Sequence, residues 1–178
     1  MFTPARSWAV VAVAGLLAAV WLGLLDPAVV LEPPAPGGLG VLAGTARVTD
    51  GDTIVINGTR VRLIGIDAPE AQQGCQRDGR SWRCGTAATE ALRGLVGHGT
   101  VRCQDLGRDR YARALAVCWA GGTELNRELV RAGWAVAYYP RRGVTGPRYE
   151  TEQAEARAAK RGLWSGSFVP PAQHRRGP

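Results

Sequence analysis

The sequence predicts an α+β domain built around a small β-barrel, because short β-rich runs come first and helical runs gather toward the C-terminal end. The chain has 178 residues, which leaves room for one domain of ordinary size and for appendages at its ends. We expect the folded domain between residues 43 and 168. A net charge of +7, from 22 basic and 15 acidic residues, favours a polyanionic partner such as nucleic acid or anionic lipid.

The N-terminal part of the chain is expected to lie outside this domain. Residues 8–25 form an uninterrupted apolar run behind a basic flank, and such a run can cross a bilayer with residues 1–7 in the cytoplasm. A transmembrane anchor is favoured over a cleaved signal sequence because no clear cleavage site follows, but both alternatives export the domain. Residues 26–42 are rich in Pro and Gly and predict a linker, and residues 169–178 predict a disordered tail.

The cysteine pattern agrees with export. None of the four cysteines lies in a C-x-x-C pair, and the two histidines have no zinc-binding spacing. An even number of cysteines outside the cytoplasm predicts two disulfides. The residues concerned are Cys75, Cys84, Cys103 and Cys118.

A two-residue hairpin is predicted at Asn57-Gly58, which lies between two β-branched runs. The turn fixes the register of the strands. The expected facing pairs are Ile56 with Thr59, Ile54 with Val61, and Thr53 with Arg62. Asp52 is therefore expected beside Arg62 from local geometry alone.

A second hairpin is predicted from residues 100–106 and 113–120. Three helices are also predicted, the first from its apolar spacing and the other two from residues typical of helix ends. If Cys103 and Cys118 face each other across this hairpin, Cys75 and Cys84 would close the long loop before the first helix. The helices are expected at Thr86–Val96, from Thr123 as N-cap to Ala132, and from Pro147 at the first helical position to Arg161.

Three polar clusters are candidates for chemistry: Asp50 to Thr53, Arg62 to Glu70, and Arg108 to Arg113. Taken singly, each has an ordinary explanation, because Asp-Gly is a common turn, an arginine can decorate an edge strand, and a basic loop is usually solvated. An arginine within an apolar strand nevertheless needs a partner, and two carboxylates follow Arg62 directly. In the third cluster, arginines beside a tyrosine suit phosphate oxygens and a stacked base.

Together the clusters make a consistent site for phosphodiester hydrolysis. Asp52 and Asp67 offer hard oxygen ligands without His or Cys, which favours Ca²⁺ or Mg²⁺ over zinc. Glu70 can polarise a water molecule, and Arg62 with Arg113 can neutralise the charge of the transition state. A metal, a base and two guanidinium groups are what this reaction needs when water is the nucleophile.

Four motifs in order resemble the staphylococcal (micrococcal) nuclease family, also called thermonuclease-like, over residues 45–164: D-G-D-T, R-L-x-G-I-D-x-P-E, D-R-Y-x-R and N-R-E-L-V-R-x-G. The resemblance implies a five-stranded OB-fold barrel with three helices and one bound Ca²⁺. It also implies an endonuclease that cleaves DNA and RNA, single-stranded or locally melted, to products with 3′-phosphate ends. We expect the protein to act as a monomer.

The resemblance further implies the members of a metal site and of a catalytic group. Asp52 and Asp67 are similar to the carboxylate ligands of the family, with the backbone carbonyl of Ala68 as a third ligand and Asp50 nearby. Glu70 is similar to the general base.

A phosphate clamp and a nucleotide contact are implied in the same way. Arg62 and Arg113 resemble the clamping pair, and Tyr111 and Tyr138 resemble the tyrosines that touch the nucleotide. Arg110 is expected to bind substrate beside Tyr111.

The sequence departs from the family pattern at three places. Ala68 replaces a Thr, which costs only a hydroxyl group if the metal ligand is the backbone carbonyl. Ala112 replaces a Gly, and an alanine would be strained there if the loop needs a positive φ. An insertion around Cys75 and Cys84 could reshape access to the site.

Two other classes of function compete with the enzyme. A catalytically inactive OB-fold module that binds nucleic acid would be expected to lose its metal carboxylates or its paired arginines, and this chain keeps both. A membrane-tethered structural module would show no salt-dependent affinity for DNA.

Overall fold

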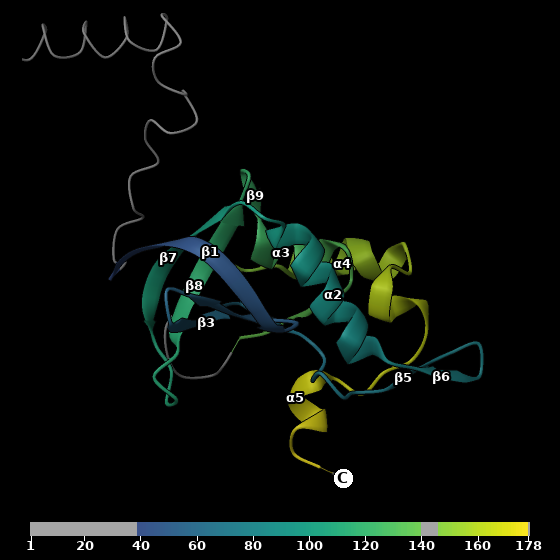
Figure 1. Cartoon of the computed structure of the whole chain (residues 1–178). Coiled ribbons are helices and arrows are strands. Elements are labelled where there is room, and N and C mark those ends of the chain that lie inside the picture. Colours follow the sequence, from purple (N-terminus) through teal and green to yellow (C-terminus); the bar gives the residue numbers. More distant parts are fainter. Residues whose placement is uncertain (1–38, 140–145, 178) are drawn as a thin grey trace, which may run out of the picture. The chain divides into compact units, whose positions relative to one another are not determined.

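A curled sheet forms the centre of the fold in the computed structural model, which describes residues 39–139 and 146–177. Within these residues, six strands pair in the order β3-β2-β1-β7-β8-β9, and β3 also pairs with β8. That last pairing closes five strands into a barrel, as predicted (Figure 1). The sheet comprises β1 (Gly40–Asp50), β2 (Thr53–Ile56), β3 (Thr59–Leu63), β7 (Thr100–Arg108), β8 (Ala114–Ala120) and β9 (Thr123–Glu124).

The β2–β3 hairpin has the predicted register. Asn57 and Gly58 both have positive φ, 48° and 80°, as a two-residue hairpin turn of this kind requires. Thr53 faces Arg62, and Ile54 faces Val61. Ile54, Val61 and Leu63 are fully buried in the barrel core, where each apolar side chain contributes about 1.5–3 kcal/mol. The register thus carries the arginine to the end of the strand that approaches the acidic residues.

The β7–β8 hairpin is closed by the predicted disulfide. Cys103 faces Cys118 and is bonded to it, with 4.0 Å between the two Cα atoms. The ladder is irregular between Asp105 and Gly107, where the Asp105 carboxylate accepts a hydrogen bond from the Gly107 amide at 3.1 Å. This irregularity lies at the strand end that leads into the loop with Arg113.

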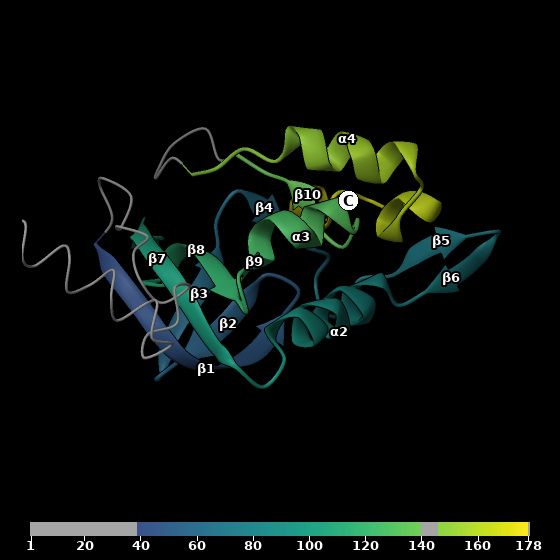
Figure 2. The same cartoon turned by 90° about the horizontal axis from the view of Figure 1, so that it is seen from above.

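Three helices gather beside the barrel in both views (Figures 1 and 2). They are α2 (Cys84–Val96), α3 (Leu125–Arg131) and α4 (Glu150–Ala158). Leu92, Leu125 and Leu129 are fully buried and join the core of the barrel. The three predicted helices therefore form, although two begin later than expected.

The predicted starts of α3 and α4 are wrong because tertiary contacts outweigh local capping signals. Thr123 lies in β9 and pairs with Ala120, so the helix begins only after Glu124. Pro147 precedes α4 by several residues because Tyr149, with a φ of −123°, is not helical and buries its ring in the core. The Tyr149 hydroxyl donates a hydrogen bond to Glu124 at 2.7 Å, which joins the two helix starts.

Two small sheets lie outside the barrel. One pairs β4 (Ile66–Asp67) with β10 (Val136–Ala137), and the other pairs β5 (Cys75–Arg77) with β6 (Arg80–Trp82). The β5–β6 hairpin extends away from the barrel, and the predicted Cys75–Cys84 disulfide ties its base to α2 (Figures 1 and 2).

The predicted domain boundaries differ from the structure at both ends. The first strand begins at Gly40 because its first residues pair with β7, whereas the linker was expected to reach residue 42. Residues 162–165 form the short helix η1 (Gly162–Ser165), and the expected disordered tail contains another, α5 (Pro171–His174). The tail is ordered because its polar groups bond to the domain.

Across residues 39–139 and 146–177, no helix has the length and apolar character to span a membrane, and the anchor predicted at 8–25 lies outside these stretches.

Candidate active site

One cavity of about 670 Å³ collects the polar clusters that the sequence singled out. It is open to solvent at the end of β3, where the turn after β1, the segment after β4 and the loop between β7 and β8 meet. Its lining comprises Asp50, Asp52, Arg62, Ala68, Pro69, Glu70, Arg108, Asp109, Arg110, Tyr111, Arg113, Leu115, Tyr138 and Arg175. Of the predicted site residues, Asp67 alone is absent from this lining, because it lies fully buried behind it.

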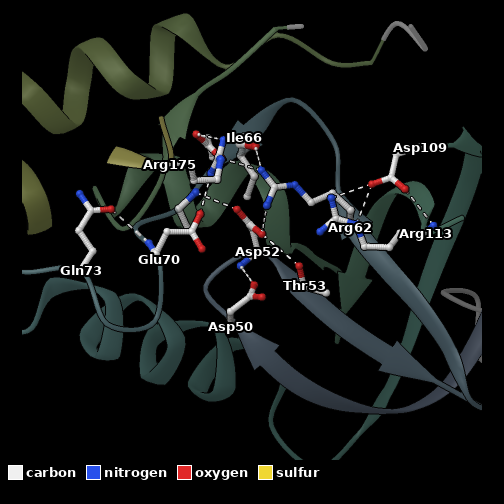
Figure 3. A network of polar contacts seen from close by, with 12 residues as sticks. Asp50, Asp52, Thr53, Arg62, Ile66, Glu70, Gln73, Asp109, Arg113 and Arg175 are labelled. Carbon is white, nitrogen blue, oxygen red and sulfur yellow. Dashed lines mark hydrogen bonds and ion pairs between the residues drawn. The ribbon is translucent and has the colours of Figure 1, made fainter. Parts of the chain in front are cut away.

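Arg62 bridges the two carboxylates that were predicted as metal ligands. One terminal nitrogen of its guanidinium donates to Asp52, and the other donates to Asp67 at 2.7 Å and to the carbonyl of Ile66 at 3.4 Å. Asp52 and Asp67 are 3% and 0% exposed, so their charges need partners, and Arg62 is a cationic partner that they share. The prediction that Asp52 lies beside Arg62 is confirmed (Figure 3).

Burial and neighbouring charge act in opposite directions on this group. Burial raises the pKa of Asp52, and the charge of Asp50 adds to the rise, while Arg62 lowers it. Burial lowers the pKa of Arg62, but the charges of Asp52 and Asp67 outweigh that effect and raise it overall. The guanidinium therefore stays charged, and the carboxylates around it make a site in which positive charge is favoured.

Close backbone approaches hold the acidic segments together. A Cβ added to Gly51 would lie 2.7 Å from the Cβ of Ala68, and one added to Gly85 would lie 1.7 Å from the carbonyl oxygen of Glu70. The amide of Ala68 donates to Asp52 at 2.9 Å. A larger residue at Gly51 would therefore push the Ala68 segment away from the Asp52 turn, and one at Gly85 would push the Glu70 segment away from α2.

Glu70 is held by its backbone while its carboxylate remains half exposed. Its amide donates to the side-chain oxygen of Gln73 at 3.2 Å, and its carbonyl accepts from the Gln73 amide at 2.7 Å. The side chain is 44% exposed and accepts a hydrogen bond from Arg175 at 2.8 Å. A carboxylate at this position can reach both solvent and a molecule bound in the cavity.

Asp109 organises the loop that carries Arg113. One of its oxygens accepts from the backbone amides of Tyr111 at 2.8 Å and Arg113 at 3.0 Å, and the other accepts from Nε of Arg113 at 2.7 Å. These bonds outweigh the effect of burial and lower the pKa of Asp109. Ala112 has a φ of 60°, so the strain expected where it replaces a glycine is present.

The comparisons with known proteins agree with this geometry. Residues 60–166 match the family model described as staphylococcal nuclease homologue, and this range contains Arg62, Asp67, Glu70 and Arg113. The chain belongs to this family.

The proteins to which the chain is similar in sequence carry different names. It is 40% identical over 131 residues to an uncharacterized endonuclease of Escherichia coli O157:H7, covering 70% of this chain and 78% of that protein. It is 35% identical to a micrococcal nuclease of Shigella flexneri, over 78% of this chain and 82% of that one. It is also 38% identical to the succinoglycan biosynthesis protein ExoI of Rhizobium meliloti, of whose length it spans 64%, with 69% of this chain covered.

Two tyrosines of this staphylococcal nuclease homologue line the cavity, Tyr111 and Tyr138. Tyr111 is 62% exposed, and the guanidiniums of Arg110 and Arg113 lie 4.7 and 5.6 Å from the centre of its ring. Tyr138 follows β10, and its amide donates to the carbonyl of Gly65 at 2.9 Å. Tyr111 thus presents an exposed ring with two guanidinium groups beside it.

Three residues that shape the site were not predicted from the sequence. Asp109 is the first residue of the D-R-Y-x-R motif, and its position four residues before Arg113 could have indicated an ion pair between the two. Gln73 is buried and connects the Glu70 amide to the tail, where its side-chain nitrogen donates to the Val169 carbonyl at 2.7 Å. Arg175 comes from the predicted tail, and no local pattern signals its long-range contact.

The carboxylates of the site have the chemistry that a hard divalent cation requires. All available ligands are oxygen atoms, and the cysteines are bonded to one another. In the part of the chain that the structure describes, no three His, Cys, Asp or Glu side chains are grouped closely enough to hold a metal ion by themselves. A cation here would bind Asp52 and Asp67 together with backbone oxygen and water, which suits Ca²⁺ better than zinc.

Proposed function

We propose that the protein is a calcium-dependent endonuclease that hydrolyses phosphodiester bonds of DNA and RNA and leaves 3′-phosphate ends. The observation that carries the proposal is the convergence of Arg62, Glu70 and Arg113, with two buried aspartates, around one open cavity. Membership of the staphylococcal nuclease homologue family and the names of its relatives support it.

The proposed roles follow from charge and exposure. Glu70, half exposed at the cavity, accepts a proton from water that attacks the phosphorus in line with the leaving oxygen. Arg62 and Arg113 both line the cavity and would neutralise the charge that builds up on the phosphate oxygens. Bound to Asp52, Asp67 and the Ala68 carbonyl, with Asp50 nearby, Ca²⁺ would supply further positive charge at the phosphate.

The proposed substrate is single-stranded or locally melted nucleic acid. Tyr111 and Tyr138 offer rings on which an unpaired base can stack, and Arg110 offers donors for an adjacent phosphate. Bases within a duplex cannot reach such rings without unstacking. A net charge of +7 favours binding of any polyanion and predicts an affinity that falls as salt rises.

We further propose that a monomer acts outside the cytoplasm. The two disulfides are typical of proteins that fold in an oxidising compartment. Residues 8–25 would anchor the nuclease to the plasma membrane, or would direct its secretion if they are removed.

The test is a digestion assay with the full chain. Single-stranded DNA and RNA are incubated with Ca²⁺, with a chelator, and with the chelator followed by excess Ca²⁺. We expect cleavage in the first and third samples and products that carry 3′-phosphates. Nucleic acid that is retarded on a gel but intact in all samples would instead indicate the inactive binding module.

A further inference from the structure

The C-terminal segment enters the candidate site. Arg175, directly after α5, donates to both oxygens of Asp67, each at 2.9 Å, and to Glu70 at 2.8 Å. Figure 3 shows its guanidinium beside Glu70, on the side of the cavity where Ile66 lies. The residue lies beyond the range 60–166 that matches the family model, so this contact belongs to the chain's own C-terminal segment.

The position of this segment is set by contacts before α5. Ser167 and Gln76 exchange two backbone hydrogen bonds at 2.9 Å, and Gln73 bonds the carbonyl of Val169. A Cβ added to Gly166 would lie 2.0 Å from the Gln76 carbonyl, so the chain passes very close to β5. The segment is thus directed toward Glu70, while α5 itself is only a four-residue helix at the surface.

Arg175 uses the same atoms that the proposed reaction needs. Asp67 has one oxygen bonded to both Arg62 and Arg175 and the other bonded to Arg175. A cation that coordinates Asp67 from the cavity would be repelled by the positive charge of Arg175. A water molecule beside Glu70 would have to share its space with the same guanidinium. Two positive groups cannot occupy this space without strong repulsion.

We propose that Arg175 is an intrachain ligand of the Asp67–Glu70 pair, which holds the site until a divalent cation displaces it. This inference rests on the proposed function. Arg175 keeps its charge at any ordinary pH, so release requires competition for the carboxylates and not loss of a proton from the guanidinium. Its side chain is 37% exposed, and the helix before it is short, so the end of the chain can detach without opening the barrel.

Calcium titration of the full chain by calorimetry tests the competition. Arg175→Gln removes the guanidinium, and Arg176→Gln is the matched control, because it lies next in the chain, is exposed, and changes the net charge equally. Charge-assisted hydrogen bonds of this kind predict that Arg175→Gln binds Ca²⁺ about 10- to 100-fold more tightly than wild type. The control should bind within about 2-fold of wild type, since a single exposed charge contributes little.

Two results of the titration would have different meanings. Equal affinity in wild type and Arg175→Gln, or an equal gain in both variants, would overturn the competition and leave the nuclease intact. No Ca²⁺ binding in any of the three proteins would overturn the proposed function together with the inference.

Hydrogen exchange gives a readout that does not depend on activity. The amides of residues 173–177 bond within the tail, to carbonyls from Pro170 to His174. We expect Ca²⁺ to speed exchange of these amides in wild type and to leave them unchanged in Arg175→Gln, whose tail is already released. Slower exchange in wild type on adding Ca²⁺ would contradict displacement.

Discussion

The two walls of the cavity are held by different means. On the acidic wall, Arg62 lies between Asp52 and Asp67, all three come from paired strands or their ends, and both carboxylates are buried. On the loop wall, Asp109 of the same loop orients Arg113 through an ion pair. Among the described residues, neither of these two side chains bonds to a segment more distant in sequence. Strand pairing therefore positions the charged residues of the acidic wall, whereas one carboxylate, that of Asp109, positions Arg113 on the loop wall.

This difference predicts unequal responses to substitution. Breaking a buried ion pair leaves an uncompensated charge and threatens the fold, whereas the exposed loop can lose its carboxylate and remain folded. The pKa of Asp109 is lowered, so its contribution to stability is present above the ordinary Asp range and is lost only as pH falls through the lowered folded value. The loop wall should therefore keep its arrangement at neutral pH.

The largest expected effect is at Glu70, whose side chain faces the cavity. Glu70→Gln keeps the shape and can still accept from Arg175, but it cannot take a proton from water. We expect turnover to fall about 10²–10⁴-fold with unchanged thermal unfolding. Glu90→Gln, on the exposed face of α2, is the matched control. Wild-type turnover in Glu70→Gln would remove this residue from the mechanism.

A loss of similar or slightly smaller size is expected for Arg113→Ala. The guanidinium is proposed to stabilise charge in the transition state, so kcat should fall by about 10²–10³-fold while KM changes little. Arg110→Ala in the same loop is the control, and there we expect a change mainly in KM. If Arg113→Ala also altered only KM, its role would be binding of the ground state.

Asp109→Asn tests whether the loop wall depends on one carboxylate. The asparagine side chain can still accept a hydrogen bond from the backbone amide of Arg113, but it binds the guanidinium more weakly because it has no charge. The guanidinium should therefore be held less firmly in its position. We expect a fall in kcat of about 10-fold, which is smaller than the loss from removing Arg113 itself. Unchanged kcat would mean that other contacts position the arginine.

The smallest effect is expected at Ala112, whose φ of 60° suits glycine better. Ala112→Gly should relieve backbone strain and raise the free energy of unfolding by about 1 kcal/mol, with activity retained. Chemical denaturation measures this difference. A destabilised Ala112→Gly would show that the entropy of the unfolded loop outweighs the strain.

The acidic wall was largely predictable from the sequence. The Asn57-Gly58 turn fixes the strand register, and this register alone brings Asp52 to Arg62. Local turn chemistry and the period of two along a strand carry this information, so it can be read without knowing the rest of the fold. The facing of Cys103 and Cys118 was assumed and not fixed by a turn, and the structure shows the two residues opposite each other.

The remaining parts depend on contacts between distant segments. Local capping signals predict helix starts at Thr123 and Pro147. The pairing of Thr123 with Ala120 and the burial of Tyr149 instead move both starts further along the chain. Arg175 meets Asp67 across 108 positions of sequence, and a basic group near a chain end gives no hint of such a partner. The roles of individual site residues stay predictions until variants are measured.

The most direct test of one shared site is the double variant Glu70→Gln with Arg113→Ala, compared with each single variant. Groups that act together on one phosphate lose their effect together, so we predict that turnover falls by much less than the product of the two single losses. Losses that multiply fully would show that the two walls act independently, and would contradict a single catalytic centre at this cavity.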